Sequence, residues 1–593
     1  MAAFIRSRKF QLLAVALVAA AAVSSLHFWL FWQQTAREFV KQAYYAITGA
    51  DFRPDLNRFG HDQILEFAET PAVYLGVIDP ESPDYRIRRG FEINVDSAGY
   101  TYPVNVVFPQ NAGQDADDPR YYVAELHGNI KYTDRAGKVH TFASDLLEFP
   151  PTEMRISDEF GISGLAIIPG THDLLITHPV NDPDTNLFFN AITRLHSKDG
   201  RSIYEKTTVL TLVGEHTCPS NQIQQISFGP DGKLYVSVGD AMNFALSKDL
   251  SKWGGKVLRM NLDGSACKDN PFYNVEKPSS PESYVFASGL RNCFDFVFDR
   301  QNNTIWAGDV GKVINRLVNI HAGSDLGWDG TEESFCRNPA YLFQDRFVPV
   351  GITQIDPAVM GKEFDGCVWL AGYSGSFGPG PGRSKRIISF RIQSGRIVDG
   401  PTGVLEYIGQ SQSTLLGLTQ GPDGVYAVDF FGDQTGGDAT GMGRVMRITT
   451  SERTSQLPLN NKPSSWDKWS NLERGKYLFT SSMGCGKCHT VLKLSAGLEG
   501  PELTHLATHL RERLGSDEYQ EAASLIASEN PRVQDEIEEV LNSSDDARLR
   551  IWLQHHIRNP KFDNPKAKMP AFDPAFYSDE DVDLLIDLLL TFE

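Results

Sequence analysis

A short strand–turn–strand phrase recurs along the middle of this 593-residue chain and constrains its fold more than any other feature. Residues 228–240 read FGPDGKLYVSVGD, residues 421–429 read GPDGVYAVD, and weaker copies begin at 121, 167 and 298. Their spacing indicates a period of about 60 residues, or roughly six units over residues 75–450. Repeated sheets with Asp-Gly turns predict a mainly β fold, a six-bladed β-propeller that leaves only short edges. A pair of β-sandwiches, the alternative, would not keep so long a period.

The first 35 residues predict export of the chain. Residues 1–9 carry three positive charges, and an uncharged apolar run follows from Phe10 to about Trp32. About 23 helical residues at roughly 1.5 Å each span a ~30 Å hydrocarbon core, and the basic end stays cytoplasmic. We therefore expect residues 1–35 to form a single-pass anchor in a bacterial inner membrane, followed by a linker over 36–74 and periplasmic domains. Cleavage of a signal peptide, with secretion to the periplasm, is the alternative.

The charge balance argues against nucleic acid as a partner. The chain has 56 Lys and Arg against 75 Asp and Glu, which gives a formal net charge of −19. Its basic clusters are short and isolated, whereas a nucleic-acid surface needs many clustered cations.

Five of the seven cysteines lie outside any recognisable motif. In an oxidising compartment they could form up to two disulfides and leave one thiol, and the sequence does not give the pairing. These five are Cys218, Cys267, Cys293, Cys336 and Cys367.

The strongest chemical signal is the run Cys485-Gly-Lys-Cys488-His489. Its spacing lets two thiols form thioethers to the vinyl groups of a haem, while the adjacent histidine coordinates the iron. A zinc site would need two further ligands at matching spacing, and a redox dithiol would not need the trailing histidine. An amphipathic helix over residues 471–479 leads into the motif, after a linker over 451–470.

The second axial ligand is expected downstream, in a loop before a closing helix. Met569 lies in a Pro-rich loop, and Ser578 is the expected cap of a helix that runs to about Phe592. Residues 471–593 therefore resemble an all-α class I cytochrome c, and the resemblance implies His489 and Met569 as the axial ligands of a covalent haem c. Such ligation raises the reduction potential and suits electron transfer; oxygen or ligand sensing would need an open sixth position.

One stretch departs from the cytochrome pattern. Residues 504–548 are rich in Glu, Asp and Ser, and we expect them to form solvated helices. Four histidines are expected on helix surfaces, with one of them replacing Met569 as the alternative: His505, His509, His555 and His556.

The repeats of the middle domain resemble the glucose/sorbosone dehydrogenase family, six-bladed propellers that include pyrroloquinoline quinone (PQQ)-dependent sugar dehydrogenases. The resembling segments follow the family's order along most of the domain. They are residues 161–169, 228–232, 255–265, 287–292, 308–311 and 326–329.

The resemblance implies a quinone site on the propeller axis. Arg291 and Asn292 match the family's cofactor-facing pair, and a guanidinium suits the carboxylates and quinone oxygen of PQQ. Arg291 as a structural link between blades is the alternative. Calcium is usual in the family, but no acidic run here has the spacing of a calcium site, and residues such as Asp240 are more often turn formers.

Three positions depart from the family's site. Asn221 stands where the family has its general base and cannot titrate, although its amide could still contact PQQ. His216, five residues earlier, could replace that base only if the loop folds differently. Thr414 and Leu416 stand where the family places two arginines, so a trianionic cofactor would lose much of its positive surroundings.

Together the domains predict a periplasmic oxidoreductase. A sugar, alcohol or aldehyde would be oxidised at PQQ, and electrons would pass through the haem to a respiratory acceptor, either a partner cytochrome or an oxidase. A tethered cytochrome is held at high effective concentration near its donor. The alternative is a propeller without cofactor that serves as a docking module on an electron-transfer cytochrome. An open axial pocket would favour the enzyme, and an axis filled by large apolar side chains would favour the docking module.

Overall fold

The computed structural model describes the protein from Gly76 onward. The expected membrane anchor and the linker after it therefore lie outside the described residues. No helix within the described ranges is long and apolar enough to cross a membrane. The described residues are 76–593 except 111–112, 150–159, 186, 313, 344–346, 374–384, 410, 431–439, 460–461, 464–465, 492–493, 497–499, 566, 568, 570, 573 and 575–576.

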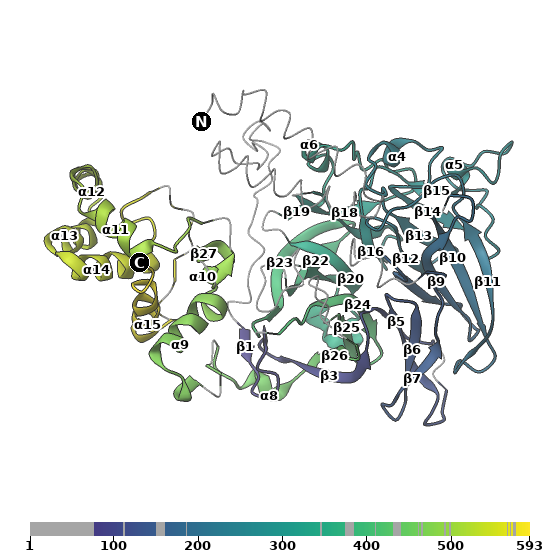
Figure 1. Cartoon of the computed structure of the whole chain (residues 1–593), viewed down its shortest axis with the longest axis horizontal. Coiled ribbons are helices and arrows are strands. Elements are labelled where there is room, and N and C mark those ends of the chain that lie inside the picture. Colours follow the sequence, from purple (N-terminus) through teal and green to yellow (C-terminus); the bar gives the residue numbers. More distant parts are fainter. Residues whose placement is uncertain are drawn as a thin grey trace, which may run out of the picture.

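Six β-sheets surround a common axis and confirm the predicted six-bladed propeller (Figure 1). The innermost strand of each sheet contacts the innermost strands of both neighbours, and the sixth contacts the first, so the ring is closed. From the axis outward, blade 1 is β4 (Pro103–Val107), β5 (Pro119–Glu125), β6 (Asn129–Asp134) and β7 (Val139–Ala143). Blade 2 is β8 (Gly164–Ile167), β9 (Leu174–Asn181), β10 (Phe188–Ser197) and β11 (Ile203–Thr211). Blade 3 is β12 (Ile223–Phe228), β13 (Leu234–Val238), β14 (Lys256–Met260) and β15 (Val285–Ala287).

The other three blades complete the ring. Blade 4 is β16 (Cys293–Phe298), β17 (Ile305–Asp309), β18 (Asn315–Ile320) and β19 (Tyr341–Phe343). Blade 5 is β20 (Val348–Gln354), β21 (Cys367–Tyr373), β22 (Arg386–Gln393) and β23 (Arg396–Tyr407), extended by β2 (Tyr85–Arg88) and β1 (Gly76–Ile78). Blade 6 is β24 (Leu415–Gly421), β25 (Gly424–Asp429), β26 (Gly443–Thr450) and β3 (Phe91–Tyr100). Since β3 precedes blade 1 in the chain, its pairing with β26 joins the two ends of the ring.

Short helices lie in the connections, and a separate group of helices follows the propeller (Figure 1). The short ones are α4 (Ala245–Lys248), α5 (Pro281–Tyr284), α6 (Glu332–Phe335), α7 (Pro357–Met360), η3 (Lys362–Phe364), α8 (Glu452–Ser455) and η4 (Trp466–Lys468). The helical domain contains α9 (Asn471–Tyr477), η5 (Leu478–Ser482), α10 (Cys485–Cys488), α11 (Leu506–Leu514), α12 (Asp517–Glu529), α13 (Gln534–Asn542), α14 (Asp545–Arg558) and α15 (Asp579–Leu589), with the two-residue strands β27 (Thr490–Val491) and β28 (Ser495–Ala496).

The acidic residue that ends the repeated phrase has a structural role. In blade 4, Asp309 Oδ1 accepts hydrogen bonds from the backbone N–H groups of Arg291 and Asn292 at 2.9 and 3.0 Å. In blade 6, Asp429 Oδ1 accepts from the Thr414 N–H at 2.9 Å. The second strand of these blades therefore caps the start of the inner strand, which positions the residues at one end of the axis.

The five cysteines for which up to two disulfides were expected are all free thiols in the structure. Burial raises the pKa of the Cys267, Cys293 and Cys367 thiols, so these side chains stay protonated and pack as small apolar groups.

Asp295 joins three neighbouring inner strands. Its Oδ1 accepts from Gln225 Nε2 at 2.7 Å and from the Phe296 N–H at 2.8 Å, and its Oδ2 accepts from the Ile352 N–H at 3.0 Å. Burial disfavours the charged carboxylate and raises the pKa of Asp295 to about 7.

The raised pKa of Asp295 predicts that the protein loses stability as the pH rises. An unfolded chain releases this proton near pH 4, whereas the folded chain holds it up to about pH 7. Between these values the folded state binds the extra proton, so the free energy of unfolding should fall by about 2 kcal/mol from pH 5 to pH 7. Urea unfolding of wild type and Asp295→Asn at both pH values measures this slope. The variant cannot ionise and should lose that contribution; identical slopes in the two proteins would contradict the assignment.

Candidate functional site

The segment before the Cys-x-x-Cys-His motif is helical, as the sequence predicts. Helix α9 begins with a capping box, in which the Ser470 hydroxyl accepts from the Glu473 N–H and the Glu473 carboxylate accepts from the Ser470 N–H. The chain continues through η5, a turn of π-helix, a feature frequent at functional sites. Gly484 then takes a left-handed conformation, φ 69°, which glycine adopts without strain and which starts α10.

His489 is held by the chain that follows the motif. Its Nδ1 donates a hydrogen bond to the Pro501 carbonyl oxygen, 2.8 Å away. A Cβ at Gly500 would lie 2.3 Å from His489 Cε1, so only glycine allows this close approach. The bond at Nδ1 fixes the tautomer in which Nε2 carries the lone pair, which is the arrangement of a metal-ligating histidine.

The other donor side chains lie in the same domain. Cys485 and Met569 are half-buried and pack against the apolar core of the helical domain. The Cys488 side chain and Pro570 lie outside the described part. Within the described residues, no three His, Cys, Asp or Glu side chains gather as ligands of a bare metal ion. A c-type haem is attached through cysteine thiols, and its iron is ligated by an imidazole and a methionine thioether, so the residues present fit that group.

The closing helix confirms the expected cap. The Ser578 hydroxyl accepts from the Asp581 N–H, and the Asp581 carboxylate accepts from the Ser578 N–H. The helix ends at Leu589, slightly before the expected Phe592. Its buried face, which includes Leu585 and Ile586, lies against α9 and belongs to the core that contacts Met569.

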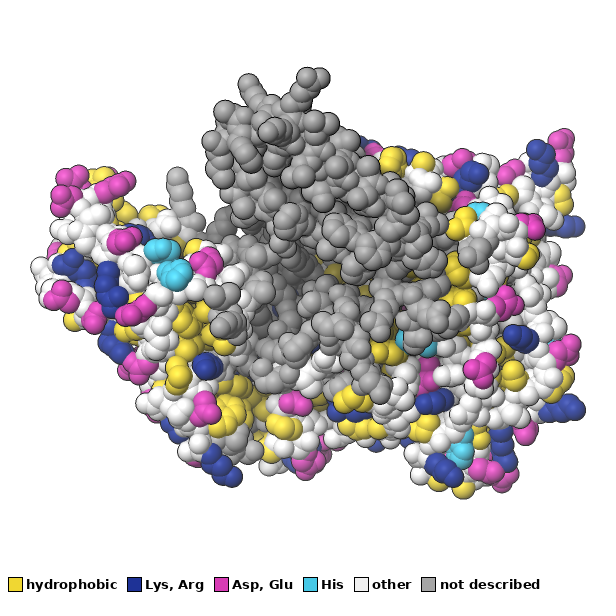
Figure 2. Space-filling view, in the orientation of Figure 1, with side chains coloured by type: hydrophobic (Ala, Val, Ile, Leu, Met, Phe, Trp, Pro, Cys, Tyr) yellow, Lys and Arg dark blue, Asp and Glu magenta, His cyan; other side chains and the backbone are white. Residues whose placement is uncertain are grey.

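The acidic stretch 504–548 is helical, as expected, and forms α11, α12 and α13. Figure 2 shows acidic and basic side chains interspersed over the outer face of this domain. The inner faces of the three helices are not solvated, because Leu510, Tyr519 and Ile537 enter the domain core. The stretch therefore enlarges that core as well as covering it.

The expectation of four surface histidines is wrong for two of them. His556 stacks on Trp552 with ring centroids 4.4 Å apart, and its side chain is only 22% exposed. Burial lowers its pKa to about 4, so it is neutral near pH 7. His555 is equally covered and bonds Glu539 Oε2 at 2.8 Å. The 3.6-residue pattern of α14 does not show how far these rings are covered, because residues outside the helix, such as Glu539 and Asp563, also lie against them.

The second candidate site is the end of the propeller axis at which the inner strands begin. Asn221 precedes β12 in a left-handed conformation, φ 57°, and its Nδ2 donates to Asp240 Oδ1 at 2.7 Å. Asp240 also accepts from the Met242 N–H at 3.0 Å and from Trp328 Nε1 at 2.8 Å. Asp240 is therefore more than a turn former, because it holds three separate segments at the axis. Backbone strain gathers here too, since Met242 also has a positive φ of 61°.

Arg291 and Asn292 lie at the start of the neighbouring inner strand, and both side chains are engaged within the protein. Arg291 is 8% exposed, and its Nη1 donates to the carbonyl oxygens of Val310 and Gly311 at 2.9 and 3.1 Å. Asn292 Oδ1 accepts from Gln224 Nε2 at 3.4 Å. These contacts support the alternative role of Arg291, which is a structural link within the propeller and not a cofactor contact.

His216 is held by blade 2. Its Nε2 lies 2.6 Å from Asp182 Oδ2, and its ring stacks on Phe189 with centroids 4.7 Å apart. The loop before β12 thus directs His216 toward partners in β10 and the β9–β10 turn, while Asn221 faces Asp240.

An apolar cluster covers the same end of the axis at blades 1, 5 and 6. Leu126 and Phe430 are buried, and Tyr102, Tyr373 and Leu416 pack against them. Each residue lies at or next to the strand end that faces this side. Leu416, which stands in place of a family arginine, therefore contributes to an apolar surface.

Lys385 is a candidate site residue that the sequence reasoning missed. It immediately precedes β22, is 3% exposed, and its Nζ lies 5.3 Å from the centre of the Tyr407 ring. Burial lowers its pKa to about 8, while Asp429 opposes that shift. In the sequence it is one member of a short basic cluster, and nothing in that pattern indicates which member is buried.

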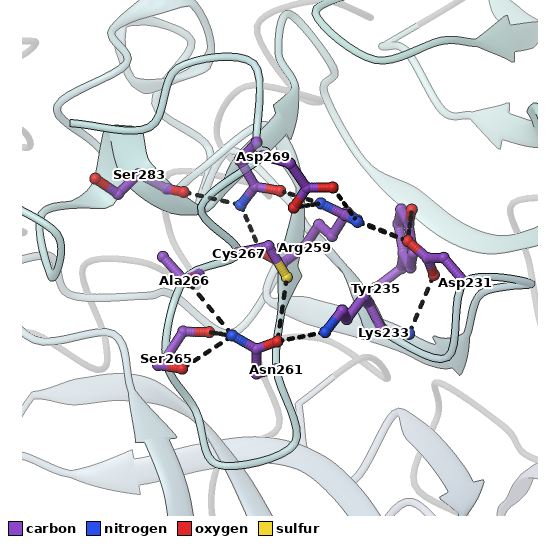
Figure 3. Close-up of polar contacts among 11 residues, drawn as sticks. Asp231, Lys233, Tyr235, Arg259, Asn261, Ser265, Ala266, Cys267, Asp269 and Ser283 are labelled. Atoms are coloured by element: carbon purple, nitrogen blue, oxygen red, sulfur yellow. Dashed lines mark hydrogen bonds and ion pairs between the residues drawn. The ribbon is translucent and has the colours of Figure 1, made fainter. Parts of the chain in front are cut away.

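A polar cluster on blade 3 lies apart from both sites (Figure 3). Arg259 forms paired hydrogen bonds with Asp269 at 2.9 and 3.0 Å. Asn261 Oδ1 accepts from Lys233 Nζ at 2.7 Å and lies 3.7 Å from the Cys267 sulfur. The cluster borders a surface pocket of about 510 Å³ and stabilises the turns at the end of β14.

Comparison with known proteins supports the fold assignment. Residues 112–338, which run from β5 of blade 1 to the connection before β19 of blade 4, match the family described as Glucose / Sorbosone dehydrogenase. Quinoprotein glucose dehydrogenase B of Acinetobacter calcoaceticus is 29% identical over 154 residues, which cover 22% of this chain and 31% of that protein. HIPL1 protein of Arabidopsis thaliana is 33% identical over 133 residues, covering 18% of each chain. The matches thus span less than a third of these relatives.

Among solved structures, the PQQ-bound aldose sugar dehydrogenase of Streptomyces coelicolor is 22% identical, with a TM-score of 0.47, over 62% of this chain and 100% of that chain. The match to the family model makes the propeller glucose/sorbosone dehydrogenase-like.

Proposed function

We propose that the chain is an electron-transfer protein of the cell envelope whose C-terminal domain carries a covalent haem c. The observation that supports this best is the fixed His489 ring, held by the Pro501 carbonyl and by contact with Gly500. Cys485 and Cys488 would hold the haem by thioethers, and His489 and Met569 would ligate the iron. A c-type haem bound there supplies one-electron transfer. The chain's own contribution is to orient the imidazole and to exclude water with the core around Met569.

We propose further that the electrons come from a small-molecule oxidation at the propeller and leave to a respiratory acceptor in the periplasm. The family match and the buried cation Lys385 favour a sugar, alcohol or aldehyde dehydrogenase. The residues at these positions do not supply the family's base or its two arginines, because Asn221 cannot titrate and Thr414 and Leu416 replace the arginines. The matching Arg291 already binds two carbonyl oxygens. We therefore derive no catalytic step through PQQ or calcium.

The engaged side chains favour a second candidate function. In it the propeller binds or docks another protein, and only the helical domain carries electrons. The apolar cluster around Phe430 supports this alternative, because it covers part of the axial end that a cofactor would need.

Two measurements on full-length protein test these proposals. Haem that stays attached after denaturation, and is lost in Cys485→Ala and in Cys488→Ala, is the result expected for haem c; a wild-type chain without attached haem would refute it.

Haem reduction by an aldose, alcohol or aldehyde only when PQQ and calcium are present would identify the dehydrogenase. The docking module would be identified by three results together: dithionite reduces the haem normally, no substrate reduces it, and calorimetry shows no heat of PQQ binding.

A further inference from the structure

A buried arginine of the propeller reaches the segment that leads into the Cys-x-x-Cys-His motif. Arg86, in β2, is 1% exposed, and its Nη1 donates to the Ser482 carbonyl oxygen at 3.1 Å. In Figure 1, α9 lies beside β1 at this side of the propeller. Ser482 ends η5, three residues before Cys485, and three residues span at most about 10 Å. A propeller cation therefore lies close to the proposed haem attachment.

Arg86 has partners on both sides, one in the propeller and one in the helical domain. On the propeller side, Glu406 is its cross-strand neighbour on β23, is 1% exposed, and lies 3.9 Å from Nη1. On the other side, the Ser482 carbonyl also accepts a hydrogen bond from the Tyr577 hydroxyl at 2.8 Å. Arg86 thus lies between a buried carboxylate and the helical domain, with its guanidinium against that domain.

We propose that Arg86 sets the reduction potential of the haem on the helical domain and that Glu406 partly offsets it. This inference rests on the proposed haem site. Ferric iron carries one more positive charge than ferrous iron, so a nearby buried cation favours the reduced state and a buried anion favours the oxidised state. Because the pair is shielded from water and salt, its field is screened much less than that of a surface pair. At about 10 Å and an effective dielectric constant of about 20, one charge changes the reduction equilibrium by roughly tenfold.

The two partners predict opposite effects, which separates an electrostatic role from a packing role. Arg86→Met removes the cation and should lower the equilibrium constant for one-electron reduction about tenfold, or ~59 mV for a one-electron couple. Glu406→Gln removes the anion and should shift the potential upward. The double variant Arg86→Met/Glu406→Gln, which removes both charges of the pair, should fall between the single variants.

The experiment is a spectroelectrochemical titration of the haem in the full-length chain, with dithionite as reductant and soluble mediators. Arg88→Met is the matched control, because Arg88 is on the same strand and its guanidinium lies over the Phe364 ring, 5.3 Å from the ring centre. Arg88→Met removes an equal charge that does not contact Ser482. The reduction potential of this variant should differ from that of the wild type by only a small fraction of the shift in Arg86→Met.

The outcomes distinguish this inference from the haem assignment. Wild-type protein without covalent haem would overturn the proposed function and, with it, the inference. Covalent haem with shifts of the same sign in Arg86→Met and Glu406→Gln, or no shift in either, would overturn the inference alone. If Arg86→Met fails to fold, Glu406→Gln still decides it, because an upward shift of the potential supports the inference and a downward shift or no shift overturns it.

Discussion

Replacing His489 with alanine should abolish the low-spin spectrum of the attached haem and slow its reduction at least about tenfold. The thioethers through Cys485 and Cys488 would keep the haem attached, but the iron would lose its fixed imidazole. Even the loss of a supporting hydrogen bond to a metal ligand typically lowers metal affinity or activity 10- to 100-fold, so the loss of the ligand itself should lower activity at least as much. Absorption spectra of the oxidised and reduced protein and stopped-flow reduction by dithionite measure both effects.

A graded variant and a control sharpen this test. Gly500→Ala would place a Cβ 2.3 Å from His489 Cε1 and should displace the ring. The low-spin spectrum should then be partly lost, and reduction should slow by less than in His489→Ala. His505→Ala removes an exposed imidazole whose Nδ1 bonds the Glu593 carbonyl, and it should leave the spectrum unchanged. An unaltered spectrum in His489→Ala would exclude His489 as a ligand.

Arg316→Met should destabilise the propeller by about 3–5 kcal/mol. Arg316 and Asp309 are both fully buried, and Arg316 Nη2 lies 2.7 Å from Asp309 Oδ2. Removing the cation leaves an uncompensated carboxylate inside the protein, and breaking a buried pair in this way is strongly destabilising. Asp309 also caps the start of β16, so the loss should spread to Arg291 and Asn292. Guanidinium unfolding followed by tryptophan fluorescence measures the change.

The matched control for the buried pair is a surface pair of the same chemistry. Arg337 lies 3.3 Å from Asp329, and its side chain is 57% exposed. Arg337→Met should therefore cost less than about 1 kcal/mol, because solvent screens the lost interaction. Equal losses in Arg316→Met and Arg337→Met would show that burial does not determine the strength of these pairs.

The blades and the haem motif could be predicted because their signals are local. The phrase that ends in Gly-Asp combines a strand, a tight turn and a second strand, and its recurrence requires sheets that pack on one another. In blades 4 and 6 the Asp at its end caps the start of the inner strand of the same blade, which explains why the phrase includes an acid. In the helical domain, the caps at Ser470 and Ser578 also depend only on residues three positions away, and both are present.

The axial site could not be predicted in the same way. Asn221 and Arg291 were identified by position, but their partners Asp240, Val310 and Gly311 come from other strands and connections. Lys385 was overlooked because its burial depends on how blades 5 and 6 meet. His556 was misplaced because the helical pattern does not show that its ring stacks on Trp552 and lies beside Asp563, which follows the helix.

The sequence alone therefore determined the class of fold and the order of its parts, since strand periodicity and turn chemistry are set within short stretches of chain. The spacing of the Cys-x-x-Cys-His motif led in the same way to the proposed haem ligands. Only the tertiary structure decided which charged groups are buried and what they contact. Arg86 and Ser482 are almost 400 positions apart, and only the packing of the helical domain on blade 5 brings them to 3.1 Å. A buried charge acts through the low dielectric of its surroundings, and those surroundings do not exist until the chain has folded.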